Sequence, residues 1–260
     1  MDVELNRELI SGYTSGSQIS RVLTEHWAAE NMYCPRCGCA RLVQFPSNRA
    51  VADFYCPECR NEYELKSTKL KFGATARGGK YLPCIQRITS NNNPDWFLVT
   101  YDAVEFKIND FWVIPKHFFT PEIVLKRNAL SETAQQPGWV GCKIRLKAIP
   151  QQVRICVIRN RTPVASNVVL EQMRRLSLLT MDNMNARGWM LDVLNCINQI
   201  TRETFTLDEM YFFERKLGER HPENRNIRAK IRQQLQLLRD SGFLAFRARG
   251  LYKKIHNITS

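Results

Sequence analysis

The chain lacks every sequence feature that would place it in or across a membrane. No apolar run approaches the roughly 20 residues of a membrane-spanning helix. The opening segment MDVELNRELISGYTSG has no basic region followed by an apolar one. Repeats and low-complexity tracts are absent as well. We therefore expect a folded cytoplasmic protein, and 260 residues, 44% of them apolar, suffice for one large domain and one small one.

Acidic residues are scarce relative to basic ones. The chain has 25 Asp and Glu against 38 Lys and Arg, a formal charge of +13. This balance favours a polyanionic partner, with nucleic acid first and an anionic membrane surface second. The imbalance is greatest in residues 224–260, where nine Lys or Arg stand against the single acid Asp240. That segment has apolar periodicity, so we interpret it as a folded contact surface and not as a solvated basic tail.

The first part of the chain has the patterns of a mixed α/β domain. Helical spacing over residues 17–30, with Ser17 as a reasonable N-cap, predicts a first helix. A short helix is predicted near residues 83–88, and apolar runs predict strands. Those runs cover residues 95–102, 104–115 and 153–160. Residues 164–185 are predicted to be a helix or a linker, and we place the domain boundary between residues 182 and 183.

Residues 183–260 have the pattern of a winged helix, a variant of the helix-turn-helix. Three helices are predicted over residues 187–200, 204–217 and 224–242, followed by two strands around Gly250. Thr206 with Glu209 has capping-box spacing at the second helix, and Gly242 ends the third. In the third helix four apolar residues share a face, so the opposite face can enter a DNA major groove, where Arg suits guanine and Asn or Gln suits adenine. The predicted DNA contacts are Arg225, Asn226, Arg228, Arg232, Gln233, Arg249 and Lys253. A winged helix that binds protein is the alternative.

Four of the nine cysteines have the spacing of a zinc site. Cys34 and Cys37 form one Cys-x-x-Cys pair, and Cys56 and Cys59 form another after an interval usual for four-cysteine zinc sites. Four thiolates close the coordination shell, so this zinc would be structural. Cys39 could compete for a place, whereas the remaining four cysteines have apolar neighbours and are predicted to be core residues.

The second cysteine pair lies at the predicted tip of a hairpin with arms over residues 50–55 and 62–67. Asp53 and Glu64 are about equally far from the tip, so they can face each other, and Lys66 shares a face with Glu64. Two carboxylates can bind Mg²⁺, and a nearby lysine can orient water for phosphodiester hydrolysis. A zinc-ribbon hairpin with charges on its solvent face is the alternative. Against it, Asp53 lies inside the apolar run AVADFY.

Asp53 with Glu64-Leu65-Lys66 resembles the PD-(D/E)XK nuclease motif, although Ala52 stands where a proline often precedes the Asp. The segments LTEHW, YCPRCG, VADFYC, YELKS, NNNPDWF, GWVGC and IRQQLQLLRD follow the order seen in DpnI-like restriction endonucleases, which cut GATC sites carrying N6-methyladenine. The resemblance implies Asp53, Glu64 and the Leu65 carbonyl as Mg²⁺ ligands and Lys66 as the catalytic lysine. It also implies Trp139 as a contact to methylated DNA.

The resemblance implies a restriction-endonuclease-like α/β domain with an inserted zinc site, followed by the winged helix. The function that it implies is a type II endonuclease acting on adenine-methylated double-stranded DNA, which we expect to be a monomer. A zinc-ribbon and winged-helix transcription regulator shares every feature except the need for the two acids and the lysine on one face. An RNA-binding protein would suit the charge, but a recognition helix for the wide major groove of B-DNA argues against it.

Overall fold

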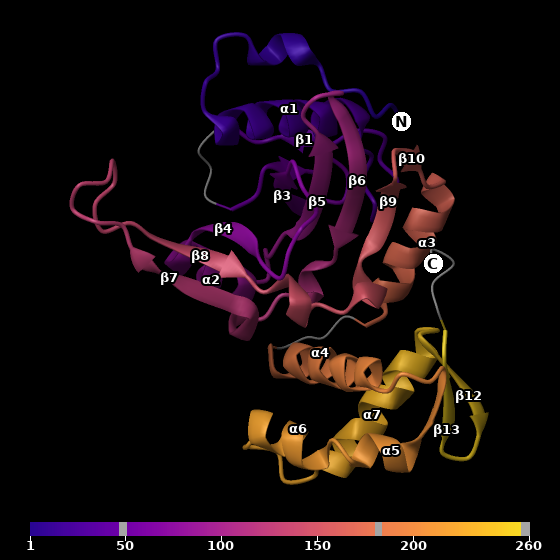
Figure 1. Cartoon of the computed structure of the whole chain (residues 1–260). Coiled ribbons are helices and arrows are strands. Elements are labelled where there is room, and N and C mark those ends of the chain that lie inside the picture. Colours follow the sequence, from indigo (N-terminus) through magenta and orange to yellow (C-terminus); the bar gives the residue numbers. More distant parts are fainter. Residues whose placement is uncertain (47–50, 180–183, 256–260) are drawn as a thin grey trace. The chain divides into compact units, whose positions relative to one another are not determined.

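The computed structural model describes residues 1–46, 51–179 and 184–255 (Figure 1). The chain forms two compact units, one of Met1–Lys147 with Arg154–Arg174 and one of Ala148–Val153 with Arg175–Ser260. The predicted domain boundary between residues 182 and 183 lies outside the described residues. Within the described part of the chain, no helix is both long and apolar enough to cross a membrane.

A seven-stranded sheet organises the larger unit (Figure 1). Its strands, in spatial order, are β1 (Val43–Gln44), β2 (Phe54–Tyr55), β3 (Glu62–Thr68), β5 (Asp95–Asp102), β6 (Lys107–Ile114), β9 (Ile155–Arg159) and β10 (Thr162–Pro163). The three strands predicted from apolar runs are therefore the adjacent strands β5, β6 and β9. Only β3 and β5 pair in parallel within this sheet. A parallel pair needs a crossover, and β4 (Ala76–Lys80) with α2 (Tyr81–Thr89) lies between them in the chain.

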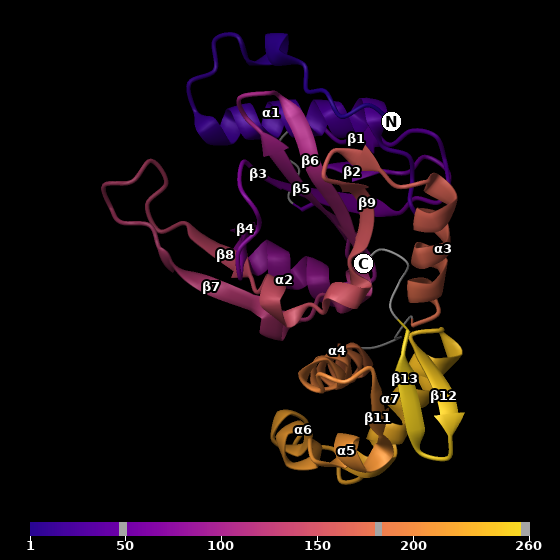
Figure 2. The same ribbon diagram turned by 45° about the vertical axis from the view of Figure 1, so that its right-hand side comes forward.

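A second sheet has the order β4, β8 (Val140–Ile144) and β7 (Val124–Ala129). The β7–β8 connection extends away from the rest of the unit, which Figures 1 and 2 both show. The helix α3 (Ser166–Ser177) follows β10, in the stretch where a helix or linker was predicted. Single turns of 3-10 helix lie at Arg7–Ile10, Lys116–Phe118, Pro121–Ile123, Leu146–Ala148 and Gln151–Val153.

The helix α1 (Gly16–Asn31) packs its apolar face on the large sheet. The ring of Trp27 contacts that of Phe111, with centroids 5.5 Å apart. Phe97 lies 5.1 Å from Phe111 and stacks on Tyr63 at 4.5 Å, so a chain of buried rings joins α1 to β3. The helix begins one residue before the predicted N-cap Ser17. Ser15 takes the N-cap position instead, because its backbone is extended and its carbonyl accepts from Ile19.

The smaller unit has the winged-helix order of elements, as predicted (Figure 2). Its elements are α4 (Met184–Gln199), β11 (Thr204–Thr206), α5 (Leu207–Tyr211), α6 (Glu214–Arg220), α7 (Ile227–Asp240), β12 (Leu244–Ala248) and β13 (Leu251–Lys254). The capping box predicted for the second helix, Thr206 with Glu209, is confirmed at the start of α5. The helix predicted over residues 204–217 is not continuous, because it divides into α5 and α6, and residues 204–206 form β11, which pairs with β13 and buries Phe205 against Tyr252.

Candidate metal centres and nucleic-acid interface

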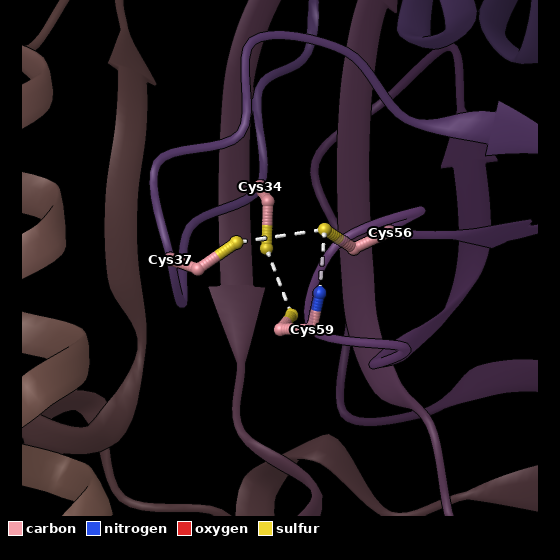
Figure 3. Close-up of side chains that lie close together, drawn as sticks. All are labelled: Cys34, Cys37, Cys56 and Cys59. Carbon is pink, nitrogen blue, oxygen red and sulfur yellow. Dashed lines mark hydrogen bonds between the residues drawn. The ribbon is translucent and has the colours of Figure 1, made fainter.

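The four cysteines of the two predicted pairs converge at one point (Figure 3). Their sulfur atoms all lie within 4.8 Å of one another, with Cys34 to Cys59 at 3.6 Å and Cys37 to Cys56 at 3.5 Å. A Zn–S bond of about 2.3 Å in a tetrahedron gives sulfur separations of about 3.8 Å. The arrangement therefore fits a zinc ion. Cys39 is not one of these four, and its thiol donates to the Arg41 carbonyl.

Both cysteine turns are closed in the same way. In the first, Gly38 N–H donates to the Cys34 carbonyl at 2.9 Å; in the second, Arg60 N–H donates to the Cys56 carbonyl at 3.0 Å. Gly38 and Arg60 each follow the second cysteine of a pair and have φ of +81° and +60°. Both turns therefore end in the left-handed region, which glycine adopts at little cost and arginine adopts against a steric penalty.

The hairpin brings the two predicted acids together. Phe54 pairs with Tyr63 in the β2–β3 ladder, and the N–H of Asp53, just before β2, donates to the Tyr63 carbonyl at 2.8 Å. Asp53 therefore lies beside the start of β3, where the negative charge of Glu64 acts on it. The Leu65 N–H donates to Asp53 Oδ2 at 2.7 Å. Because the N–H and C=O of one strand residue point to the same side, the Leu65 carbonyl faces the side on which Asp53 lies. The carboxylates of Asp53 and Glu64 and the carbonyl of Leu65 are oxygen donors, which are the ligands that suit Mg²⁺.

The first arm of the hairpin is shorter than the predicted residues 50–55, because β2 begins only at Phe54. Val51 and Ala52 have φ of +57° and +113°. This turn aims the Ala52 N–H at Glu64 Oε2, 2.6 Å away, and both residues are buried. A proline has φ near −65° and no N–H, so the residue common in the broader motif is incompatible with this backbone.

The charged groups of the site shift one another's pKa values. Burial, reinforced by the negative charge of Glu64, raises the pKa of Asp53 to about 7. Lys66 Nζ contacts Glu64 Oε1, and although burial opposes its charged form, Glu64 and Asp53 outweigh that effect and raise the pKa of Lys66. Two carboxylates that crowd each other beside a single ammonium favour an additional cation.

An open cleft of about 690 Å³ borders Asp53, Leu65 and Lys66. The helix α1 forms one wall of the cleft, and the segment between β3 and β4 forms the other. The charged residues that line it besides Asp53 and Lys66 are Arg21, Glu25, Lys69, Lys71 and Arg77. The sequence signal was the density of Lys and Arg in KSTKLKFGATARGGK.

Trp139 is half-buried and lies outside the core, directly before the first residue of β8. Its indole ring lies against Gly141, where an added Cβ would come within 2.4 Å of the ring. Gly138 has φ of +73°, which a turn into the hairpin requires. With Tyr81 and Leu82, Trp139 lines an apolar cavity of about 640 Å³. The Gly-Trp-x-Gly segment thus builds a flat aromatic surface beside an open cavity.

Of the predicted contact residues, Arg228, Arg232 and Gln233 are exposed on α7. Arg225 and the N-cap Asn226, just before the helix, are exposed as well. Arg228 pairs with Glu214 at 2.7 Å, and Arg232 donates to the Tyr211 hydroxyl at 2.7 Å.

The two predicted wing residues differ from each other. Arg249 is exposed at the β12–β13 turn. Lys253 is half-buried and lies 3.8 Å from Glu203.

Two family models match nearly the whole chain. The DpnI model, described as the Dam-replacing family, matches residues 1–182, and its companion, the Dam-replacing HTH domain, matches residues 185–254. The chain belongs to the DpnI family. Members of this family are methyl-dependent restriction endonucleases, so the DpnI-like chain is assigned to the nucleases, with a winged helix that binds DNA.

Proposed function

We propose that this protein is a Mg²⁺-dependent type II endonuclease that cleaves double-stranded DNA at GATC sites carrying N6-methyladenine, and that it acts as a monomer. The observation that carries the proposal is the convergence of Asp53, Glu64 and Lys66 at a basic cleft. Membership of the DpnI family supports the methyl dependence. The GATC target follows from the family resemblance alone.

Asp53 and Glu64 would hold the Mg²⁺ together with the Leu65 carbonyl. Bound there, the ion would stabilise the charge that builds on the phosphate and favour ionisation of the attacking water. Lys66, kept protonated by the two acids, orients that water and adds positive charge next to the phosphate. The Ala52 and Leu65 N–H groups hold the two carboxylates in place before DNA arrives. Lys69, Lys71 and Arg77 attract the DNA backbone to the cleft.

Methylation is proposed to be read twice, because one reading discriminates too weakly. Burying one methyl group contributes only about 0.8 kcal/mol. Two methyl groups on a symmetric site give about 1.6 kcal/mol, a preference of about fifteenfold. A nuclease that spares unmethylated DNA needs more. We assign one reading to the exposed side of α7, with Arg225, Asn226, Arg228, Arg232 and Gln233, helped by Arg249 and Lys253. Trp139, whose indole has an exposed apolar surface, is assigned the other.

The experiment uses one plasmid prepared with and without adenine methylation, incubated with the purified protein and Mg²⁺. Discrete fragments are expected from the methylated plasmid only, and none after addition of a chelator. Asp53→Ala and Glu64→Ala should abolish cleavage and retain DNA binding, since neither change touches α7. Cleavage by either variant at the wild-type rate would remove these carboxylates from the reaction. A wild-type protein that binds methylated DNA but never cuts it would indicate a DNA-binding regulator instead.

A further inference from the structure

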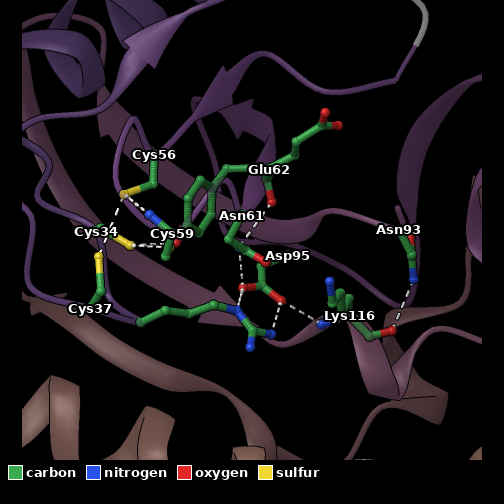
Figure 4. Close-up of polar contacts among 11 residues, drawn as sticks. Cys34, Cys37, Cys56, Cys59, Asn61, Glu62, Asn93, Asp95 and Lys116 are labelled. Atoms are coloured by element: carbon green, nitrogen blue, oxygen red, sulfur yellow. Dashed lines mark hydrogen bonds and ion pairs between the residues drawn. The ribbon is translucent and has the colours of Figure 1, made fainter. Parts of the chain in front are cut away.

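The first residue of β5 carries a fully buried carboxylate that accepts four hydrogen bonds (Figure 4). Arg36 donates to Asp95 with Nε at 2.7 Å from Oδ2 and with Nη2 at 2.9 Å from Oδ1. Asn61 Nδ2 lies 2.8 Å from Oδ2, and the backbone N–H of Lys116 lies 2.8 Å from Oδ1. Each carboxylate oxygen of Asp95 therefore accepts two donors.

These donors come from both turns of the cysteine cluster. Arg36 lies between Cys34 and Cys37, inside the first turn. Asn61 is two residues beyond Cys59, and its carbonyl accepts from the Cys56 N–H at 2.9 Å, so it closes the second turn. Asp95 is thus bound to both halves of the cluster through side chains that are not metal ligands.

Asp95 is also next to the strand that carries the acid and the lysine. It pairs with Tyr63 in the parallel β3–β5 ladder, and Tyr63 is the neighbour of Glu64. The Tyr63 hydroxyl lies 3.0 Å from Cys34 Sγ. The cluster and Glu64 are therefore joined by two short routes. One runs through the Tyr63 hydroxyl directly to Cys34, and the other runs through the Tyr63–Asp95 pair to Arg36 and Asn61 in the two cysteine turns.

We propose that Asp95 is a positioning residue for DNA cleavage, which fixes both cysteine turns to β5 and thereby holds Glu64 beside Asp53. The inference rests on the proposed function, because it assigns Asp95 a role in the same reaction. The charge of Asp95 matters as well as its shape. Although burial favours the neutral acid, Arg36 and the Lys116 N–H hold the pKa of Asp95 below its usual range.

Asparagine has nearly the same shape but cannot replace this carboxylate. Its single carbonyl oxygen can accept two of the four donors, and its amide N–H groups would face the other two donors. The Arg36 guanidinium, whose side chain is only 20% exposed, would also lose its partner. Asp95→Asn therefore releases at least one cysteine turn while keeping the side-chain volume.

The test compares Asp95→Asn with a matched control on the same strand. Asp102 is the last residue of β5 and accepts from Arg161 and two backbone N–H groups. Seven steps of about 3.3 Å separate the two residues, so Asp102→Asn removes a similar ion pair far from the cysteine cluster. Both full-length variants are measured for zinc content, rate of zinc release to a chelator, kcat and KM on methylated DNA, and Mg²⁺ dependence.

For Asp95→Asn we expect one zinc per chain, released faster than from the wild type. Loss of a supporting partner costs about 10- to 100-fold in metal affinity or activity. We therefore expect kcat to fall by about that factor and the Mg²⁺ concentration at half-maximal rate to rise, with KM for DNA unchanged. Asp102→Asn should match the wild type in all of these. A wild-type kcat and Mg²⁺ dependence in Asp95→Asn would overturn the inference, since a merely structural role lowers only the melting temperature.

A second variant covers the case in which Asp95→Asn does not fold. Asn61→Ala removes one of the four hydrogen bonds and leaves the Arg36 pair intact, so it should fold and show a smaller fall in kcat. An unchanged kcat in Asn61→Ala would overturn the inference. The two proposals fail separately: cleavage by Asp53→Ala would refute the proposed function. An inactive Asp53→Ala beside a fully active Asp95→Asn would refute only the role of Asp95.

Discussion

Replacing Ala52 by proline, the residue common in the broader nuclease motif, should destroy this site. The Ala52 N–H donates to the buried carboxylate of Glu64 at 2.6 Å, and proline has no N–H. Hydrogen bonds to charged groups contribute about 1.5–3 kcal/mol. Proline also requires φ near −65° where Ala52 has +113°, so the turn before Asp53 must be rebuilt. We expect the free energy of unfolding to fall by about 3 kcal/mol, or roughly 6 to 12 °C in melting temperature for a unit of this size.

The matched control is Ala52→Gly, which keeps the N–H. Relief of the positive φ should stabilise the fold by about 1–2 kcal/mol. Loss of the buried methyl costs about 0.8 kcal/mol, and the greater freedom of glycine in the unfolded chain costs about 0.5–1 kcal/mol. These terms nearly cancel, so Ala52→Gly should have wild-type stability and activity.

The assay combines thermal unfolding with single-turnover cleavage of methylated DNA by zinc-loaded protein. Ala52→Pro should cleave about 100-fold more slowly, because a displacement of the order of 1 Å at a reacting centre has that effect. Wild-type cleavage by Ala52→Pro would refute the reasoning. So would an equal loss in Ala52→Gly, because that result would place the effect in the methyl group and not in the N–H.

Three further predictions concern other parts of the molecule. Cys56→Ser should lose zinc and cleavage together, whereas Cys39→Ser should keep both, as elemental analysis and a cleavage assay will show; equal behaviour of the two would contradict the assignment of the cluster. Trp139→Ala should lower cleavage of methylated sites at an unchanged melting temperature, and a destabilised protein with unchanged methyl preference would make Trp139 a purely structural residue. Arg232→Ala should change sequence preference in anisotropy titrations, while Lys253→Ala should weaken binding on every sequence and reduce the salt slope by about one.

Local patterns predicted much of this molecule. The two Cys-x-x-Cys pairs converge as their spacing indicated. Counting outward from the second pair predicted that Asp53 and Glu64 lie close together, and the hydrogen bonds from Asp53 to Tyr63 and from Leu65 to Asp53 bring them together. Both inferences needed only short-range geometry, because a tight turn fixes the register of the arms beside it. The strands β5 and β6 were likewise evident from apolar runs.

The features that sequence reasoning missed depend on contacts between distant segments. The positive φ of Ala52 is stabilised by a hydrogen bond to Glu64, twelve residues later, and nothing in the run AVADFY indicates it. Asp95 looks like the start of an ordinary strand until Arg36 and Asn61 reach it from the cysteine turns. The strand β11 is only three residues long, too short for a pattern, and exists because β13 is available to pair with it.

The order of residues in the cysteine cluster bears on how the nuclease is made in the cell. Asp53 lies between the two cysteine pairs, while Glu64 and Lys66 come after the second pair. Zinc binding to all four sulfurs would close a loop that contains Asp53. Glu64 would lie just outside that loop, close to the second cysteine pair. A newly synthesised chain that has not yet acquired zinc would therefore lack the constraint that brings its two acids together.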